Sequence, residues 1–264
     1  MDTRTILLDV GGTFIKCSDG RQIPVPSSGS RMQIQQSLKD AVGPVEAVDA
    51  VGVAIPGPFD YREGIFLMKH KFASVYGCSF REIAGLQEDV SLKFMHDVNA
   101  VLAGALEMLD LGSSNCALVT LGTGLGFSYA VSGVVQCNQS LSPAYGLWNL
   151  PHNGGILEDR ISGRGIVSAY EQITGGSGLS AYDVARLAFS GDQAALDVYQ
   201  GTGRLLGQVL APLARKLELS AVLIGGQISK SLSLFVGPLE GELPGVAVVP
   251  SPEGAVFRGL KSMF

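Results

Sequence analysis

An acidic residue followed by two glycines and a threonine stands near the start of the 264-residue sequence, at Asp9–Thr13. A carboxylate attracts metal ions, whereas glycines let backbone N–H groups approach phosphate oxygens and permit positive φ in a turn. A threonine hydroxyl adds one more donor. The pattern predicts a nucleotide-phosphate site made by Gly11, Gly12 and Thr13, in which Asp9 orients Mg²⁺ through water.

The runs on either side of this turn have the composition of strands. Apolar residues dominate 5–10 and 14–18, so a strand–turn–strand unit is predicted. Lys16 lies in the second of these strands. Two interpretations of Lys16 stay open, since its ammonium group is suited equally to phosphate and to an exposed surface.

The same order of strand, glycine turn and strand recurs about 111 residues further on. An apolar strand is predicted over Cys116–Leu121, and the turn that follows contains Gly122, Thr123 and Gly124, which predicts a second phosphate contact. Each half also has a later apolar strand that ends in a proline or glycine turn. The repetition predicts two related α/β domains that face one another, with the ligand in the cleft between them.

The domain boundary is expected where an apolar strand restarts after a small polar loop. This gives an N-terminal domain over 1–112 and a C-terminal domain with nucleotide-binding elements over 113–252. A helix is expected over about 253–264, and whether it joins the first domain is left open.

The second candidate for chemistry is the pair His96-Asp97. It stands between a predicted strand over Ser91–Met95 and a predicted helix over Asn99–Asp110, so a carboxylate is expected at a strand-to-helix junction. Transfer of a phosphoryl group to a hydroxyl needs a base that accepts the hydroxyl proton, and Asp97 is our candidate for that base. The alternative for Asp97 is a helix N-cap. For His96, a substrate contact and a structural role are equally open.

A third glycine turn follows the predicted strand over 221–224. Gly225 and Gly226 are expected to let adenine and ribose lie against the backbone, with Gln227 as a polar contact. A plain tight turn is the alternative. Neither a Walker A sequence nor G-x-G-x-x-G occurs in the chain, which argues against P-loop and dinucleotide-binding folds.

In this order, the motifs resemble the ROK family of bacterial sugar kinases and repressors, within the sugar kinase, actin and Hsp70 superfamily. The resemblance rests on residues 9–16, 56–58 with Gly64, 96–100, 121–126, 157–163 and 223–226. It implies two ribonuclease-H-like (actin-like ATPase) domains, with ATP and Mg²⁺ as cofactors. It also implies a sugar substrate, bound by Gly57, His96, Asn99 and Glu158, and a homodimer. The cytoplasm is the expected location, because neither a signal peptide nor a long apolar run is seen in the sequence.

The chain departs from the family pattern around its sugar pocket. Where the family carries G-E-x-G-H and a cysteine-rich zinc loop, this sequence has Pro143–Pro151 and Asn153–Ile156. The acid, the histidine and three thiolates are therefore missing, and no structural zinc is expected. Trp148 is expected either to stack on a sugar or to pack in the interior, with packing favoured.

Composition narrows the functional classes. The net charge of −5 argues against a broad basic surface for nucleic acid or anionic lipid, and no leader peptide or membrane span is expected. The leading hypothesis is a glucokinase-like, ATP-dependent kinase that phosphorylates a hydroxyl of a hexose or related sugar. The first alternative is a regulatory protein of the ROK family that has lost catalysis. An ATPase switch like actin or Hsp70 is a third reading, which the chain length disfavours.

Overall fold

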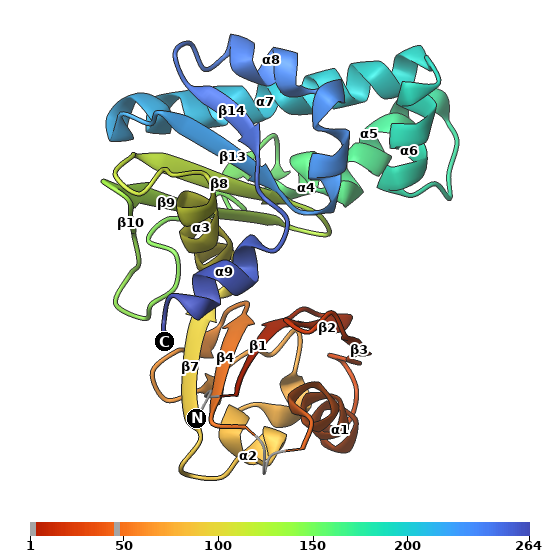
Figure 1. The fold of residues 1–264 in the computed structure, drawn as a ribbon. Coiled ribbons are helices and arrows are strands. Elements are labelled where there is room, and N and C mark those ends of the chain that lie inside the picture. Colours follow the sequence, from red (N-terminus) through yellow and green to blue (C-terminus); the bar gives the residue numbers. More distant parts are fainter. Residues whose placement is uncertain (1–3, 45–47) are drawn as a thin grey trace. The chain divides into compact units, whose positions relative to one another are not determined.

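The two strand–turn–strand repeats become two five-stranded sheets of one topology (Figure 1). This computed structural model describes residues 4–44 and 48–264, which divide into two units. Unit 1 contains the residues up to Leu109 together with Cys137–Ala144 and Glu253–Phe264, and unit 2 contains Asp110–Gln136 and Tyr145–Pro252. A division at residue 112 assigns Cys137–Ala144 to the wrong unit, because this segment packs against α3 of unit 1.

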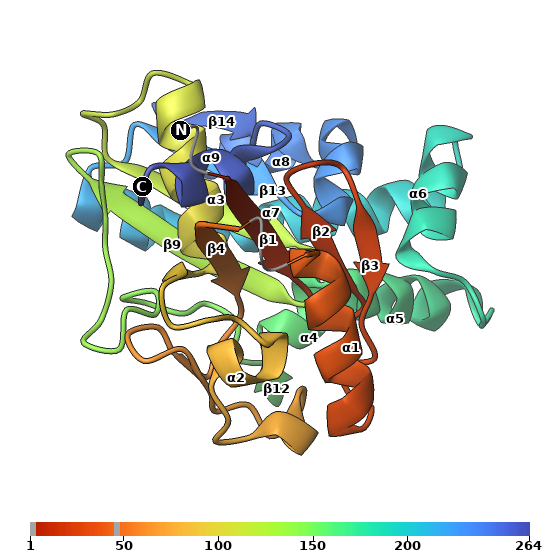
Figure 2. The ribbon, with the colours of Figure 1, turned by 60° about the horizontal axis from the view of Figure 1, so that its bottom comes forward.

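The sheet of unit 1 is mixed. From edge to edge its strands are β3 (Gln22–Pro24), β2 (Phe14–Cys17), β1 (Thr5–Val10), β4 (Ala50–Ile55) and β7 (Ser91–His96). The pairs β3–β2 and β2–β1 are antiparallel, whereas β1, β4 and β7 are parallel to one another. Figure 2 shows β4, β1, β2 and β3 in this order. All six residues of β4 are buried, as expected for a central parallel strand.

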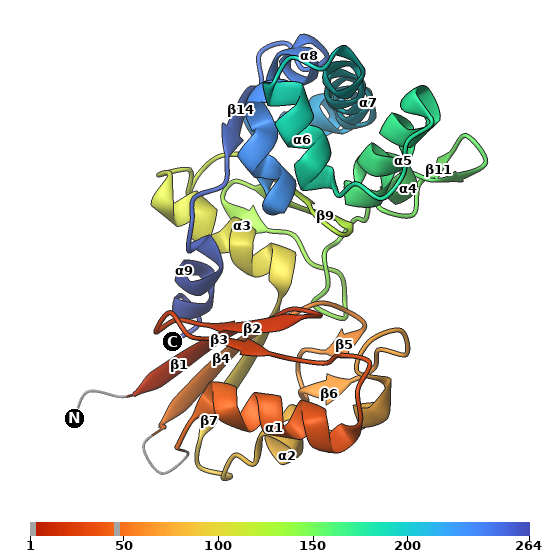
Figure 3. The same cartoon turned by 90° about the vertical axis from the view of Figure 1, so that its right-hand side faces the viewer.

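Helices cover both faces of this sheet. They are α1 (Arg31–Val42), α2 (Phe80–Ala84), α3 (Asp97–Met108) and α9 (Ala255–Lys261). Unit 1 also contains a short hairpin of β5 (Phe59–Asp60) and β6 (Ile65–Phe66), which is followed by the 3₁₀ helix η2 (Ala73–Val75). Figure 3 shows α1 and α2 on one face and α3 and α9 on the other. Alternate residues of β1 serve the two faces, since Leu8 lies in the larger core and Leu7 packs with Ala100 and Leu260.

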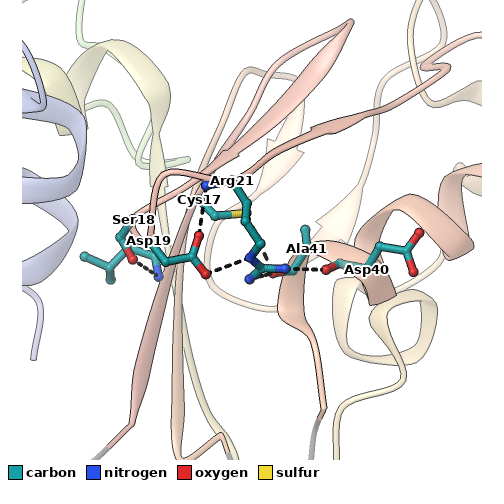
Figure 4. Close-up of polar contacts among 7 residues, drawn as sticks. Cys17, Ser18, Asp19, Arg21, Asp40 and Ala41 are labelled. Carbon is teal, nitrogen blue, oxygen red and sulfur yellow. Dashed lines mark hydrogen bonds and ion pairs between the residues drawn. The ribbon is translucent and has the colours of Figure 1, made fainter.

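The hairpin β2–β3 is tied to the end of α1 by Arg21 (Figure 4). Its guanidinium donates to the carbonyl oxygens of Asp40 and Ala41 at 2.7 and 2.9 Å, and its Nε donates to Asp19 at 2.7 Å. Cationic groups that bond the last carbonyls of a helix satisfy acceptors that have no partner within the helix. Arg21 thus fixes α1 relative to the hairpin that carries Lys16.

Unit 2 repeats the strand order of unit 1. Its strands are β10 (Val134–Val135), β9 (Leu125–Val131), β8 (Cys116–Leu121), β13 (Ala221–Gly225) and β14 (Ala247–Pro250). Its helices are α4 (Glu158–Ile161), α5 (Gly163–Thr174), α6 (Ala181–Phe189), α7 (Gln193–Leu217) and α8 (Val236–Gly241), with a 3₁₀ segment η3 (Gln227–Leu234) and a hairpin of β11 (Pro151–His152) and β12 (Gly155–Ile156). Among the described residues, no helix is both long and apolar enough to cross a bilayer.

Candidate active site

Three of the predicted site residues of unit 1, one for catalysis, one for Mg²⁺ and one for the substrate, lie at one edge of its sheet. Strands β1, β4 and β7 are parallel, and their register sets Asp9 beside Ala54 and Ile55 beside His96. The loop with Gly57 begins directly after β4, and α3 begins at Asp97. Because the carboxyl ends of parallel strands meet at the same edge, Asp9, Gly57 and Asp97 share that edge, which is where ligands bind in open α/β sheets.

Asp9 is paired with Lys16 across the hairpin. The two residues are directly opposite in the antiparallel pair β1–β2, and Lys16 Nζ lies 3.6 Å from Asp9 Oδ2. Burial raises the pKa of Asp9 above its ordinary value, the charge of Lys16 opposes this rise, and the charge of Asp97 adds to it. The Lys16 charge is therefore engaged by Asp9, and its contact with phosphate stays a prediction.

Asp97 is the first residue of α3, and His96 occupies the N-cap position. The N-cap interpretation of Asp97 is thus wrong, and the helix begins two residues earlier than predicted. Asp97 Oδ1 lies 2.7 Å from His96 Nδ1 and accepts a hydrogen bond from the Val98 N–H at 2.8 Å.

The environment of Asp97 favours its charged form. Loss of water around the carboxyl would by itself raise the pKa of Asp97, but the interaction with His96 opposes this effect. The Val98 N–H and the positive charge of Lys71 act in the same direction as His96, so the pKa lies below its ordinary value. Asp97 is therefore ionised at neutral pH and able to accept a proton.

His96 packs in an aromatic corner beside the Gly57 loop. Its ring centroid is 5.8 Å from that of Tyr61, whose hydroxyl donates to the Ile55 carbonyl at 3.1 Å. A β-carbon added to Gly57 would lie 3.5 Å from the Tyr61 hydroxyl oxygen and 3.7 Å from His96 Nε2. These contacts leave room for little more than a methyl group at Gly57.

Asn99 has a structural role in the fold. It is 1% exposed, and its Nδ2 contacts Cys137 Sγ at 3.3 Å and the Leu141 carbonyl at 3.5 Å. It thus anchors the segment 137–144 to α3, and its contact with substrate stays a prediction. Trp148 is half exposed, so the expected packing in the interior is wrong.

The first glycine turn differs in detail from the expectation. The Gly11 N–H donates to the Phe14 carbonyl at 3.0 Å, so this group is used inside the turn. Within the described part of the chain, the N–H groups of Gly12 and Thr13 make no such bond. Neither glycine has positive φ, so the turn does not use the left-handed geometry that glycine permits. The lack of a β-carbon is what matters, since one on Gly11 would lie 3.0 Å from the Phe14 oxygen.

The second glycine turn, in unit 2, has the same design. The Gly122 N–H donates to the Gly124 carbonyl at 3.0 Å, and Gly163 donates to the Gly122 carbonyl at 2.8 Å. Again neither turn glycine has positive φ. A β-carbon on Gly122 would meet open space, whereas one on Gly124 would lie 2.8 Å from Glu158 Oε2. A β-carbon at Gly124 would therefore displace the Glu158 carboxylate.

Glu158 holds this turn. Its Oε2 accepts the Leu125 N–H at 2.9 Å, and its Oε1 accepts from Arg164 Nη2 at 3.1 Å. The side chain is only 21% exposed. The sequence motif predicts a sugar contact for Glu158, which stays a prediction, but both carboxylate oxygens already have partners in unit 2.

Glu158→Ala is therefore expected to weaken ADP binding by about tenfold, since the loss of a charge-assisted hydrogen bond of roughly 1.5–3 kcal/mol loosens the turn. Glu158→Gln keeps an acceptor for the Leu125 N–H and is expected to bind ADP within about threefold of wild type. Titration calorimetry with ADP alone measures both. Unchanged ADP affinity in Glu158→Ala, with weaker sugar binding, would contradict the turn-holding role.

A cavity of about 570 Å³ opens beside this turn, within unit 2. Its lining comes from the glycine turn, one side of α5, the start of α6 with the two residues before it, and η3: Gly122, Thr123, Gly163, Arg164, Val167, Ser168, Glu171, Leu179, Ser180, Ala181, Tyr182, Gln227 and Ile228. Ligand sites commonly have this volume and mixed lining. The structure thus brings Gln227 together with Gly122 and Thr123, as the motifs predict.

The two glycines of the third turn, Gly225 and Gly226, have different surroundings. Gly225 is buried inside β13 and is not among the cavity residues, so the predicted nucleotide contact at Gly225 finds no support in the structure. Gly226 has φ +80°, and a β-carbon there would lie 2.2 Å from the Leu121 carbonyl oxygen. The backbone of β8 therefore requires glycine at Gly226.

The cavity wall from α5 and α6 was missed by sequence reasoning. Arg164, Glu171 and Tyr182 line the cavity but carry no motif of their own. Only the amphipathic pattern of the two helices is visible in the sequence, and it does not say which ends meet the glycine turn. No role was predicted for Lys71 of unit 1 either, because the sequence does not show which distant residues a loop lysine approaches. In the structure, its charge acts on Asp97.

Asp9 has the chemistry expected of a magnesium ligand. Mg²⁺ retains several waters in proteins and is held by one or two carboxylates together with substrate phosphates. Asp9 is such a carboxylate, it stands before a glycine turn, and its charge interacts with that of Asp97. No group of three or more metal-binding side chains occurs within residues 4–44 and 48–264. The residues present therefore fit an ion held mainly by water and phosphate.

Two α/β units of identical strand order, each with a glycine turn between its first two strands, define the fold of the actin-like ATPases. Within this class the chain belongs to the ROK family, whose model matches residues 3–252. The resemblance seen in the motifs is thereby confirmed.

Among curated relatives, N-acetylmannosamine kinase of Escherichia coli O157:H7 is 24% identical over 279 aligned positions, covering 96% of this chain and 90% of the relative. The ROK family glucokinase of Streptomyces griseus, solved with glucose and AMPPNP, superposes with a TM-score of 0.77 at 22% identity, covering 98% of both chains. A ROK family transcriptional regulator, a homologue of the E. coli MLC protein, gives 0.76 at 19% identity, covering 98% of this chain and 77% of the regulator. These likenesses establish the fold.

Proposed function

We propose that this protein is an ATP-dependent sugar kinase, which transfers the γ-phosphoryl group of ATP to a hydroxyl of a hexose or a related amino sugar. The observation that carries this proposal is the ionised carboxylate of Asp97, held at the sheet edge of unit 1 that also carries Asp9 and the first glycine turn. A kinase needs a base of this kind next to a phosphate-binding turn.

In the proposed reaction, Asp97 accepts the proton of the acceptor hydroxyl. The hydroxyl oxygen forms a bond to the γ-phosphorus, and the bond from that phosphorus to the bridging oxygen breaks, so that ADP leaves with the electron pair. His96 and the Val98 N–H hold the Asp97 carboxylate in position. His96 and Gly57 are proposed to contact the sugar, together with Asn99.

Within each unit, taken by itself, the glycine turn is proposed as a contact for phosphate. Within residues 4–44 and 48–264, the N–H groups of Gly12 and Thr13 in unit 1, and of Thr123 and Gly124 in unit 2, donate no backbone hydrogen bond, so they are suited to phosphate oxygens. The cavity beside Gln227 is proposed for the adenosine. Asp9 would hold Mg²⁺ through water, and when bound this ion neutralises phosphate charge.

The names of the relatives suggest two acceptors, glucose and N-acetylmannosamine. The predicted sugar pocket of this chain lacks the family's G-E-x-G-H glutamate and histidine. The sugar that this chain phosphorylates therefore has to be identified by measurement. A homodimer located in the cytoplasm is part of the proposal.

A coupled assay of ADP release tests the proposal, with Mg-ATP and a panel of glucose, mannose, N-acetylmannosamine and N-acetylglucosamine. We expect ADP release to depend on one of these sugars, with a kcat on the order of 1–100 s⁻¹. Calorimetry with the same sugars is the companion measurement. Sugar binding without turnover would instead favour a regulatory protein, and ATP hydrolysis without sugar would favour an ATPase switch.

A further inference from the structure

Lys71 is a half-buried cation in the loop between β6 and η2 of unit 1. Its side chain lies across the first glycine turn, because a β-carbon added to Gly12 would be 3.3 Å from both Cε and Nζ of Lys71. The same ammonium group interacts electrostatically with the Asp97 carboxylate. Lys71 therefore reaches both features of unit 1 on which phosphoryl transfer would depend.

The backbone next to Lys71 is firmly anchored. Phe72 has φ +54°, in the left-handed region that bulky residues rarely adopt. Its side chain is fully buried, its ring centroid is 5.6 Å from that of Phe66, and its N–H donates to the Ser27 carbonyl at 2.6 Å. Strained backbone of this kind persists where the surrounding packing enforces it, and it is found most often at ligand-binding sites. Lys71 thus projects from a fixed point.

Within the described residues, the Lys71 ammonium group feels the charge of Asp97 but forms no close ion pair, unlike Lys16. Lys16 is paired with Asp9 at 3.6 Å, and Lys69 is exposed and lies 5.3 Å over the ring of Tyr76. Among the residues that the structure describes, Nζ of Lys71 has neither a hydrogen bond nor an ion-pair partner. An ammonium group held over a glycine turn without a partner is suited to bind an anion at that turn.

We propose that Lys71 binds the phosphoryl group while it is being transferred, an inference that rests on the proposed kinase function. In the transition state, negative charge is spread over the three equatorial oxygens of this group. Nζ of Lys71 donates hydrogen bonds to these oxygens and stays protonated, since the acceptor proton goes to Asp97. An ammonium group fixed in advance lowers the barrier, because it requires no rearrangement as the charge moves.

Steady-state kinetics of Lys71→Met provide the first test. We expect kcat to fall by about 10²–10³-fold, the usual effect of removing one preorganised donor, while the KM for the sugar changes by less than about threefold. Lys71→Arg keeps the charge and is expected to restore kcat to within about tenfold of wild type. Lys69→Met is the matched control, with the same substitution two residues away, and is expected to behave as wild type.

Nucleotide binding provides a second test that does not require turnover. Calorimetry compares AMPPNP, which carries a γ-phosphoryl group, with ADP, which lacks it. We expect Lys71→Met to weaken AMPPNP at least about fivefold and to leave ADP within about twofold of wild type, because only the γ-group meets the lysine.

The outcomes separate this inference from the proposed function. A kcat of Lys71→Met within threefold of wild type would overturn the inference, and so would equal weakening of AMPPNP and ADP, or the same loss in Lys69→Met. If the wild-type protein binds nucleotide but does not phosphorylate a sugar, the proposed function fails and the binding comparison still decides on Lys71. If the wild-type protein binds neither nucleotide, both proposals fall.

Discussion

Asp97→Asn is expected to lower the sugar-dependent kcat by about 10²–10⁴-fold, the range for loss of a positioned general base. The asparagine oxygen can still accept the Val98 N–H, so α3 keeps its start, but the amide cannot take a proton from the acceptor hydroxyl. The affinities for ADP and sugar are expected to stay within about threefold of wild type, because the lost interaction belongs to the transition state.

Asp89→Asn is the control for this experiment, since it makes the same chemical change at an exposed position. A thermal melt separates catalysis from folding. A negative charge in the first turn of a helix contributes about 0.3–1 kcal/mol, so Asp97→Asn is expected to lower stability by no more than this. An Asp97→Asn variant that keeps more than a tenth of the wild-type kcat would exclude Asp97 as the base.

Gly104→Ala is expected to destabilise unit 1 by about 3 kcal/mol, at the upper end of the range for overpacking. A β-carbon on Gly104 in α3 would lie 1.8 Å from the Ala255 carbonyl oxygen and 2.7 Å from the Gly259 nitrogen in α9. A β-carbon on Gly259 would lie 2.0 Å from the Ala100 carbonyl oxygen. Both obstacles are backbone atoms, so no rotation of a side chain can relieve them and the helices must separate.

Gly201→Ala in α7 is the matched control, because a β-carbon at Gly201 meets nothing within 4 Å. In a helix without steric conflict, replacing glycine by alanine is expected to stabilise by about 0.5–1 kcal/mol. The two substitutions therefore have opposite expected signs in urea denaturation. Equal gains in stability for both variants would contradict the close backbone packing of α3 and α9.

The sequence could predict the parts of the fold that depend on local pattern. The strand–turn–strand units around Gly11–Thr13 and Gly122–Gly124 are visible because apolar runs and glycines alternate over short distances, and both occur in the structure. The position of Asp97 between β7 and α3 was also predictable, since a change of hydrophobic period marks a strand-to-helix junction. The roles of these residues in binding and catalysis stay predictions.

Contacts between distant segments could not be read from local pattern. Glu158 lies 33 positions after Leu125, yet its carboxylate accepts the Leu125 N–H. The approach of Lys71 to Gly12 and the insertion of 137–144 into unit 1 likewise depend on how the chain returns on itself. The spacing of residues in the sequence does not show which distant segments will come into contact. The φ angles of the turns could not be predicted either, because glycine permits a left-handed backbone without requiring one.

The assignment of Glu253–Phe264 to unit 1 has a consequence for synthesis on the ribosome. Leu7 and Ala54 of unit 1 pack with Leu260 of α9. Because α9 follows unit 2 in the sequence, this contact can form only after the whole of unit 2 has been translated. Unit 1 therefore begins to leave the ribosome before unit 2, but its last segment is made after unit 2. Until α9 is made, α3 alone covers the sheet face that carries Leu7 and Ala54, and the part that α9 covers stays exposed to solvent.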